Sequence, residues 1–371
     1  MLIVSGSGRS GSDQLAFNIA KGLKRNGHRV IWSCPSNCYL MDNAREYGLE
    51  IFDIFPSELK DIMVVPAIVR FCMDNKIDIV NVHNSYARRI ALSARLRGLK
   101  AKTVFTRHCI LRTLPYLGKL FHNFFVDINI SVSNVVRKSL IHGGLWPSKV
   151  VTVYGGVDIE KFENVPPWKI EQARESFACR KAFNIGIVGR FHSSENFNPM
   201  NPTRKGHEVL FKALGKTKKD INLLVLGPRK EIDLKNARVL AQHNGLNPDK
   251  ITFCGWQEDI TPFYKIMDLN VLPSPNEGLG LAIIEGMAAG VPCIGTNGGG
   301  VKEIIKDGVD GLLFSPGDSK DLADKIQFII ERKELRAALI SSAKEKVRKT
   351  FSIERIVLET QKIFYSLQNA S

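Results

Sequence analysis

Short apolar segments alternate with longer segments of helical periodicity along almost the whole chain of 371 residues. Parallel strands need long crossover connections, which are usually helices, so this alternation favours a parallel sheet with helices on both faces. The expected strands are 2–4, 30–32, 77–82, 102–106, 184–188, 222–226, 251–253, 269–272 and 292–295, and the clearest expected helices are 13–26, 206–215, 231–244 and 280–289. The fold class is therefore α/β.

The alternation is interrupted once and then starts again. Pro166 and Pro167 stand at the interruption and are typical of a linker. We therefore expect two α/β domains in tandem, over 1–165 and 166–351. A last helix is expected over 352–371, with Ser352 as its N-cap and one apolar stripe.

The charge balance restricts the partners. The chain has 52 Lys and Arg against 37 Asp and Glu, a net charge of +15. Such an excess favours anionic partners, namely phosphates, nucleic acid or an acidic membrane surface.

No apolar run reaches the length of a membrane-spanning helix, and the first residues do not resemble a signal peptide. The seven cysteines are scattered, so we expect neither a zinc site nor disulfides. Reduced cysteines are typical of the cytoplasm, where we expect this protein to be.

Several common catalytic motifs are missing from the sequence. It contains no D-x-D, P-loop, HExxH or GxSxG pattern, so no metal, no P-loop phosphate transfer, no zinc proteolysis and no α/β-hydrolase chemistry is expected. The segment 6–11 reads GSGRSG, between a strand and a helix, but no acid ends the second strand to bind a ribose. A generic glycine turn is favoured over a dinucleotide site, and its exposed backbone N–H groups could still bind another anion.

Residues 273–318 are the most informative stretch. Glu277 lies in a Pro/Gly-rich loop, and a helix is expected to open near Leu281, where its N-terminus favours a phosphate. Glu285 lies eight residues after Glu277 in an otherwise apolar run. A carboxylate there needs hydrogen-bond donors. Ribose hydroxyls would serve, and a structural pairing with Arg or a backbone N–H is the alternative.

Further candidates follow other expected strands. Gly189 and Arg190 end the strand 184–188, and Lys205 comes just before a helix, so two cations suit a diphosphate. His108 follows the strand 102–106, at the carboxyl end where open α/β sheets bind ligands, and His83 has the same kind of position with weaker support. Surface salt bridges and structural histidines are the alternatives.

The segment 107–126 contains an apolar helix with flanking cations. Five of its apolar residues can share one face, namely Leu114, Leu117, Phe121, Phe124 and Phe125, and Arg112 and Lys119 flank it. Such a face can lie on an anionic bilayer. Packing of this helix on its own sheet explains the pattern about as well.

At 273–318 the sequence resembles the family 4 retaining glycosyltransferases of the GT-B fold, which include lipopolysaccharide-core and mannosyl transferases. The matching positions are Pro273, Ser274, Glu277, Gly278, Leu279, Gly280, Glu285, Gly286, Met287, Ala288, Gly290, Pro292, Gly298, Gly299, Glu303, Gly308, Gly311 and Leu312. The stretches 153–162, 188–206 and 253–256 extend the likeness. The resemblance implies two Rossmann-like domains facing across a cleft, with the C-terminal helix returning to the N-terminal domain.

The resemblance also implies roles for individual residues. Arg190 and Lys205 would bind the donor diphosphate, and Glu277 with the backbone of 278–280 would bind the donor sugar. Glu285 would bind the ribose, and His108 would contact the sugar near the reacting carbon. The remaining donor-binding positions implied are Gly11, Gly189, Trp256, Gly278, Leu279, Gly280 and Leu281.

The expected activity is the transfer of a hexose-type sugar from a nucleotide sugar to a glycan or lipid-linked acceptor, in the synthesis of lipopolysaccharide or another surface polysaccharide. A UDP-sugar is expected rather than a GDP-sugar as the donor. Neither a metal nor a cofactor is expected. The enzyme is expected in the cytoplasm, either free or attached peripherally to the inner face of the cytoplasmic membrane through 107–126, and nucleic acid binding is not expected. A nucleotide-sugar epimerase on the same fold and a non-enzymatic basic module are the alternatives. The loop 191–203 is longer than is usual in the family.

Overall fold

The computed structural model describes residues 2–4, 10–34, 38–53, 61–110, 116–177, 182–191, 198–200, 203–217, 219–228 and 230–369. The chain divides into two compact units, Met1–Val157 with Phe351–Ser371 and Asp158–Thr350. The pair Pro166–Pro167 therefore lies inside the second unit, where Pro167 is the first residue of a helix. The missing N–H of proline costs nothing at that position.

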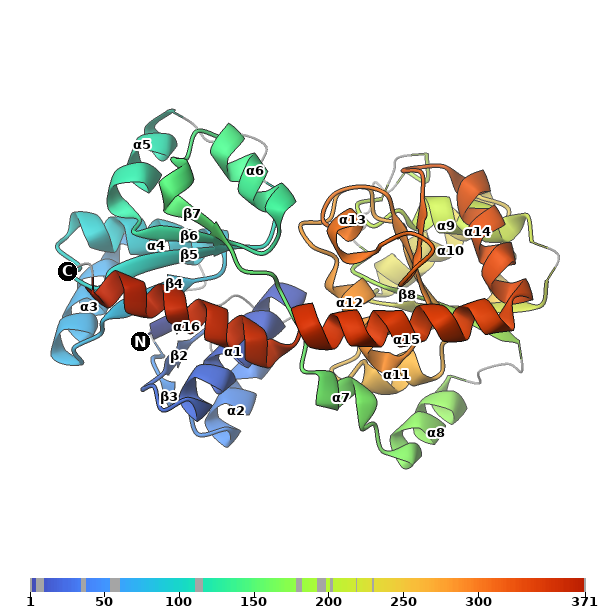
Figure 1. Ribbon diagram of the computed structural model, residues 1–371, viewed down its shortest axis with the longest axis horizontal. Helices are drawn as coiled ribbons and strands as arrows, with labels where there is room; N and C mark the ends of the chain where they lie inside the picture. Colours follow the sequence, from blue (N-terminus) through green and yellow to red (C-terminus); the bar gives the residue numbers. More distant parts are fainter. Residues whose placement is uncertain are drawn as a thin grey trace. The chain divides into compact units, whose positions relative to one another are not determined.

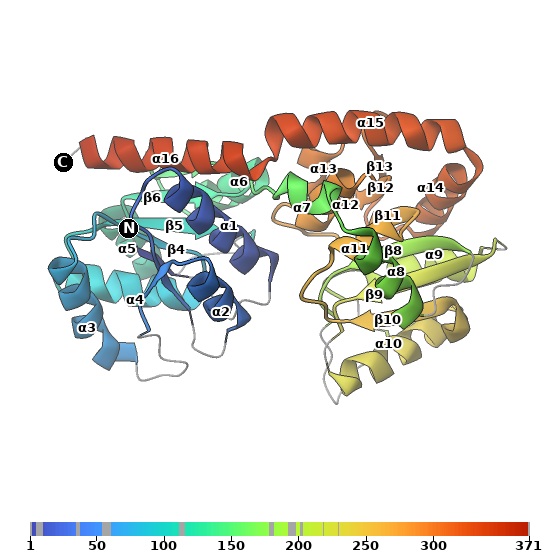
Figure 2. The same cartoon turned by 90° about the horizontal axis from the view of Figure 1, so that it is seen from below.

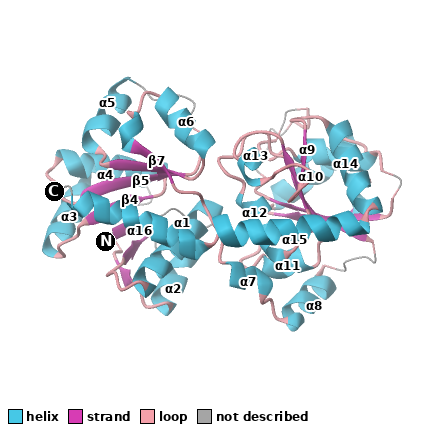
Figure 3. Ribbon diagram, in the orientation of Figure 1, coloured by secondary structure: helices cyan, strands magenta, loops and turns pink. Residues whose placement is uncertain are grey.

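The first unit is a seven-stranded parallel sheet with strand order β3-β2-β1-β4-β5-β6-β7 and helices on its faces (Figures 1 and 3). Its elements are β1 (Leu2–Val4), α1 (Gly11–Arg25), β2 (Ile31–Ser33), α2 (Tyr39–Glu46), β3 (Glu50–Ile51), α3 (Asp61–Asp74), β4 (Ile79–Val82), α4 (Ser85–Leu96), β5 (Lys102–Arg107), α5 (Tyr116–Phe125), β6 (Ile128–Ser131), α6 (Asn134–His142), β7 (Val150–Thr152) and α16 (Ile353–Asn369). The order reverses at β1 and β4, because the chain continues outward in both directions from that pair.

The C-terminal helix α16 packs on α1 of the first unit, as the resemblance implies (Figures 1 and 2). Asn26, at the end of α1, donates to Gln361 over 2.8 Å. The segment that leads into α16 pairs with Val157, the last residue of the first segment of this unit. Val157 N–H donates to Phe351 O, and Ile353 N–H donates to Val157 O, both over 2.9 Å. The last helix is thereby an integral part of the unit that contains the N-terminus.

The second unit is a six-stranded parallel sheet with strand order β10-β9-β8-β11-β12-β13. Its elements are α7 (Ile159–Glu163), α8 (Pro167–Ser176), β8 (Phe183–Val188), α9 (His207–Gly215), β9 (Ile221–Leu226), α10 (Glu231–His243), β10 (Ile251–Gly255), α11 (Thr261–Lys265), β11 (Leu269–Leu272), α12 (Leu281–Ala289), β12 (Cys293–Thr296), α13 (Val301–Ile304), β13 (Leu312–Phe314), α14 (Ser319–Glu331) and α15 (Lys333–Thr350). Most residues of these strands are buried and apolar, as in other parallel sheets covered on both faces, but Asn184, Asn222 and Asn270 are buried polar exceptions.

Helix α5 presents an unusual face. Its exposed positions carry large apolar side chains, Leu120, Phe121 and Phe124, whereas His122 and Asn123 are buried. Asn123 Nδ2 donates to Gly144 O over 3.0 Å, and Trp146 N–H donates to Asn123 Oδ1 over 3.0 Å. This clamp holds the exposed Trp146 beside Phe124, with ring centroids 5.2 Å apart.

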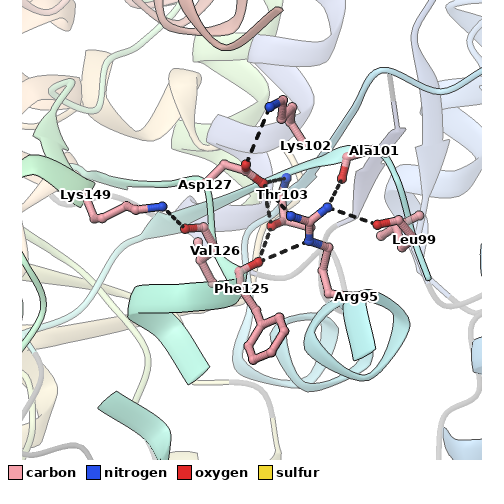
Figure 4. A network of polar contacts seen from close by, with 9 residues as sticks. All are labelled: Arg95, Leu99, Ala101, Lys102, Thr103, Phe125, Val126, Asp127 and Lys149. Carbon is pink, nitrogen blue, oxygen red and sulfur yellow. Dashed lines mark hydrogen bonds and ion pairs between the residues drawn. The ribbon is translucent and has the colours of Figure 1, made fainter. Parts of the chain in front are cut away.

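The C-terminal end of α5 is fixed by a polar network (Figure 4). Arg95 Nε donates to Phe125 O over 3.3 Å, and Lys149 Nζ donates to Val126 O over 3.0 Å. Asp127 accepts from the Thr103 backbone N–H over 2.7 Å, which ties the same corner to β5. Cations at the last carbonyls of a helix complement its dipole. The apolar face of α5 is thus held in place from its polar side.

The core of the second unit contains a histidine, His207, at the start of α9. Its ring lies against Phe191 and Phe211, with centroids 5.0 and 6.1 Å away, and the residue is 0% exposed. Its Nε2 atom has no hydrogen-bond partner among the described residues. Burial, together with the positive charge of Lys205, lowers the pKa of His207 to about 3.

We predict that His207→Leu makes the protein less sensitive to acid. An unfolded histidine binds a proton below its ordinary pKa of about 6.5, but folded His207 does not until about pH 3, so the folded state loses stability as the pH falls through this window. Between pH 7 and 4.5, the free energy of unfolding should fall by ~2–3 kcal/mol less in the variant. Urea unfolding at both pH values measures this, with His142→Leu, at an exposed position, as control. An equal loss of stability in His207→Leu and wild type would contradict it.

Candidate active site

The candidate residues of the second unit gather where its strand order reverses. Strands β8 and β11 are neighbours, and the chain continues from them toward opposite edges of the sheet. Ligands of open α/β sheets bind at the carboxyl ends of such a strand pair. Gly189 and Arg190 follow β8 there, and the loop with Glu277 follows β11.

Lys205 and Glu277 form an ion pair at this edge. Lys205 Nζ lies 2.5 Å from Glu277 Oε1, and the two side chains are 31% and 14% exposed. Ser274 Oγ donates to Arg204 O over 3.1 Å, which joins the segment before α9 to the end of β11. Gly206 has a left-handed φ of 70°, and a Cβ there would lie 2.3 Å from Pro273 O. The backbone at Gly206 therefore touches the backbone after β11, and this contact brings Lys205 to Glu277.

A second glycine segment, 298–300, supports the loop that carries Glu277. Gly300 N–H donates to Glu277 O over 2.9 Å. Gly299 has a φ of 53°, and a Cβ there would lie 2.6 Å from Glu277 O. The loop 278–280 is buried and ends at Gly280, whose φ of 104° opens α12. Leu281 is the first residue of α12, so the N-terminus of this helix follows directly on the loop that carries Glu277.

Glu285 lies one turn into α12 and is held by a tyrosine. Tyr264 of α11 is fully buried, and its hydroxyl donates to Glu285 Oε2 over 2.8 Å. Glu285 is partly exposed, and no described residue hydrogen-bonds its Oε1 atom. Burial raises the pKa of Glu285, while the hydrogen bond and the charges of Lys161 and Lys205 oppose this rise. One carboxylate oxygen is thus oriented by the protein, and the other has no hydrogen-bond partner among the described residues.

Sequence reasoning missed Tyr264 and also Asn270 of β11. Asn270 Nδ2 donates to Ala282 O over 2.8 Å and so helps to hold the first turn of α12. It also explains the glycine at 286, because a Cβ there would lie 2.6 Å from Asn270 Nδ2. A polar residue inside an apolar strand was the available signal for Asn270. Tyr264 had none beyond its place in a short apolar helix.

The other predicted positions lie around this group. Gly189 is adjacent to Lys205, since a Cβ on Gly189 would lie 3.4 Å from Lys205 Cγ. Arg190 is exposed, and within the described part of the chain it has no ion pair. Trp256 follows β10, which is separated from β8 by β9, and it is partly exposed. Most of the loop 191–203 lies outside the described residues.

His108 belongs to the first unit, where it follows β5. Its Nε2 atom lies 3.1 Å from Nδ1 of His83, which follows the neighbouring strand β4. Burial lowers the pKa of His108 to about 4, the charge of Asp13 opposes this shift, and the charge of Arg88 adds to it. Gly11 is the first residue of α1, while residues 5–9 before it lie outside the described part.

The chemistry offered by the second unit is recognition of an anion beside hydroxyl groups. Lys205, Arg190 and the start of α12 offer positive potential, and Glu277 and Glu285 are hydroxyl acceptors. Within the residues that the structure describes, no group of three or more His, Cys, Asp or Glu side chains could hold a metal ion. Over the same residues, none of the helices combines the length and apolarity needed to cross a bilayer.

Two family models match the chain. Residues 9–161 match the model described as Glycosyltransferase Family 4, and residues 200–346 match the model described as Glycosyl transferases group 1. The first match falls in the first compact unit and the start of the second, and the second match falls wholly in the second unit.

Several characterised and uncharacterised proteins are similar over most of the chain. An uncharacterized glycosyltransferase of Methanocaldococcus jannaschii is 31% identical, over 79% of this chain and 76% of its own. N-acetyl-alpha-D-glucosaminyl L-malate synthase of Bacillus anthracis is 26% identical, over 96% and 94%. A capsular polysaccharide biosynthesis glycosyltransferase of Staphylococcus aureus is 27% identical, over 72% and 68%.

Solved structures share the fold. A glycosyltransferase from Rickettsia africae has a TM-score of 0.85 at 24% identity, covering 100% of this chain and 99% of its own. The Anabaena protein HepE, in complex with UDP-glucose, has a TM-score of 0.84 at 21% identity, covering 99% and 100%. The fold is therefore GT-B, with two Rossmann-like units. On the family models and these relatives, the chain belongs to the family 4 glycosyltransferases, a retaining and metal-independent family.

Proposed function

We propose that this enzyme transfers a hexose-type sugar from a UDP-sugar to a glycan or lipid-linked acceptor during the synthesis of lipopolysaccharide or another surface polysaccharide. The observation that carries the proposal is the grouping of Lys205, Glu277 and Glu285 beside the start of α12. The second unit would bind the nucleotide sugar, and the first unit would supply the acceptor site.

The nucleotide half of the donor would bind along the edge between β8 and α12. Lys205 and Arg190 would contact the diphosphate together with the N–H groups that begin at Leu281. Glu285 would accept hydrogen bonds from the ribose hydroxyls at Oε1, because Tyr264 already occupies Oε2. Trp256 follows β10 at the far side of β9, where the base would lie.

The sugar would be held by Glu277 and the backbone of 278–280, and His108 would contact it. As the bond from the anomeric carbon to the diphosphate breaks, negative charge grows on the leaving oxygen, which Lys205 and Arg190 stabilise. The acceptor oxygen bonds to the anomeric carbon from the same face, and its proton passes to the leaving phosphate. We assign no side chain as a nucleophile.

Two similar proteins support the choice of partners. HepE has been solved with UDP-glucose, which favours UDP over GDP as the nucleotide. The Staphylococcus aureus relative acts in capsular polysaccharide biosynthesis, which favours a polymeric acceptor. The Bacillus anthracis relative carries L-malate in its name, so a small hydroxy acid is the acceptor to test beside glycans.

Glu285→Ala and Lys205→Ala should each reduce sugar transfer by a factor of ~100 or more. The first variant removes the ribose acceptor, and the second removes the charge that stabilises the leaving diphosphate. Transfer is measured by UDP release in the presence of acceptor, after a thermal-shift screen of UDP- and GDP-sugars has identified the donor. Glu285→Ala should also lose the thermal shift that UDP produces in the wild type.

Two exposed residues provide matched controls for these variants. Lys212→Ala changes a lysine on α9, and Glu334→Ala changes a glutamate on α15. Neither should alter donor binding or transfer. Transfer within threefold of wild type in folded Glu285→Ala and Lys205→Ala would refute the proposed donor site.

The exposed face of α5 is proposed to contact an anionic membrane. Leu120, Phe121, Phe124 and Trp146 form the apolar patch, and Lys119 lies beside it on the same helix. The net charge of +15 adds a long-range attraction to anionic lipids. The polar residues His122 and Asn123 are buried, and the apolar residues of α5 are exposed. This polarity is the reverse of that expected for a helix packed on its own sheet.

Phe124→Ser should weaken binding to anionic vesicles about tenfold or more, because burying one Phe contributes ~1.5–3 kcal/mol. Flotation with phosphatidylglycerol vesicles measures this, and raised salt should weaken binding further. Trp168→Ser, which changes an equally exposed aromatic residue of α8, is the control. Equal flotation with neutral and anionic vesicles, or no effect of Phe124→Ser, would remove the proposed role of this face.

A further inference from the structure

A row of four polar side chains crosses the first unit between β4 and β5 and ends at His108. Thr106 Oγ1 donates to Asn81 Oδ1 over 3.0 Å. Asn81 Nδ2 lies 3.1 Å from His83 Nε2, and His83 Nδ1 lies 3.1 Å from His108 Nε2. Thr106, Asn81 and His83 are each less than 5% exposed. Buried polar groups at this depth are costly unless all are paired, and here the row pairs them.

The donors and acceptors along the row set the position of each proton. The Thr106 hydroxyl donates to Oδ1 of Asn81, so the Asn81 amide turns its N–H toward Nε2 of His83. Nε2 of His83 must then be an acceptor, and a neutral His83 has its proton on Nδ1. That proton points at Nε2 of His108. A neutral His108 consequently carries its own proton on Nδ1.

Both imidazoles remain neutral at ordinary pH. Burial lowers the pKa of His83 well below its usual value, and the neighbouring His108 lowers it further. Around His108, the positive charge of Arg88 on α4 also disfavours a second proton, while Asp13 on α1 favours it. With Oδ1 of Asn81 toward Thr106, the neutral pair has one satisfied arrangement, in which His83 donates and His108 accepts.

We propose that His83 is a positioning residue that holds His108 in the tautomer with the proton on Nδ1. His108 would then meet its ligand as a neutral hydrogen-bond donor at Nδ1, toward an oxygen acceptor such as a sugar hydroxyl, and it could not take a proton at Nε2. The tautomer follows from contacts within the first unit alone. Its consequence for transfer rests on the function proposed above for His108.

Two substitutions of His83 separate hydrogen bonding from packing. The amide nitrogen of Asn lies near the position of imidazole Nδ1, so His83→Asn keeps a donor toward His108. The amide of Gln lies near the position of Nε2, so His83→Gln keeps a partner for Asn81 but loses the donor toward His108. If the two histidines only pack on each other, with ring centroids 5.4 Å apart, the two variants should behave alike.

The test is nitrogen-15 NMR of the full chain labelled at histidine, with long-range proton–nitrogen correlations at pH 7.5. In the wild type, His83 and His108 should both show a protonated Nδ1 and an unprotonated Nε2. His108 should keep this pattern in His83→Asn and should populate the Nε2-protonated form in His83→Gln. His142→Gln, on the surface of α6, serves as the control for a His-to-Gln change.

Transfer assays on the same variants connect the tautomer to catalysis. Loss of the group that orients a metal-bound histidine typically costs 10–100-fold, and we expect kcat to fall by about the same factor in His83→Gln and to be largely retained in His83→Asn. Protonated Nε2 on wild-type His108, or an unchanged tautomer in His83→Gln, would overturn the inference, and the wild-type spectrum decides even if a variant does not fold. The expected tautomers with unchanged kcat in His83→Gln would instead count against the role of His108 in the proposed function.

Discussion

Contact of backbone with backbone at the carboxyl edge of the second sheet is the constraint on which the candidate site depends. Gly206 lies against Pro273 O and Gly299 lies against Glu277 O, and a Cβ at either position would be 2.3 or 2.6 Å from that oxygen. Real Cβ atoms do not approach so closely, and the obstacle is backbone that cannot rotate away. These contacts set the distance between the segment with Lys205 and the loop with Glu277. An alanine at either glycine would separate the two charges before it changed any functional side chain.

Both units contain a buried neutral hydrogen-bond donor that orients a side chain at the edge of the sheet. Tyr264 donates to Glu285 in the second unit, and His83 faces His108 in the first. In both pairs the supporting residue is less than 5% exposed, while the supported one is partly exposed. A neutral donor avoids the desolvation cost of a buried cation. It also leaves one atom of the supported residue, Oε1 of Glu285 or Nδ1 of His108, available for a ligand.

Much of the fold could be predicted because apolar strands and capped helices are local patterns. The strands 222–226 and 269–272 and the helix α12 were expected within a residue or two of their observed bounds. Strands β6, with its polar Asn129, and β13, with three residues, were too short or too polar to stand out. Their pairing depends on neighbouring strands rather than on their own sequence.

The candidate site divides in the same way between local and tertiary information. Glu277 and Glu285 could be identified because carboxylates are rarely buried without a partner, so an acid in a glycine-rich loop or an apolar run indicates a specific interaction. Their partners, Lys205 at a separation of 72 residues and Tyr264 at 21, are set by tertiary contacts that a single sequence does not record. The pairing of His83 with His108 likewise requires β4 and β5 to be neighbours in register. The reversed polarity of α5 is also a tertiary result, because the contacts that bury His122 and Asn123 come from Phe105 and Arg107 of β5 and from the loop at Gly144.

The ion pair between Lys205 and Glu277 has a consequence for how the proposed donor would be recognised. Both side chains are partly exposed, so a diphosphate can compete with the carboxylate for the lysine. Once Lys205 turns to phosphate, Glu277 loses that cation and needs other hydrogen-bond donors, because an unpaired carboxylate in a largely buried loop is costly. The hydroxyls of the donor sugar would supply such donors to Glu277, whereas a nucleoside diphosphate has no sugar hydroxyls beyond its ribose, which is assigned to Glu285. In the proposed function, an exchange of partners at this one ion pair would therefore favour the intact donor over the product nucleotide.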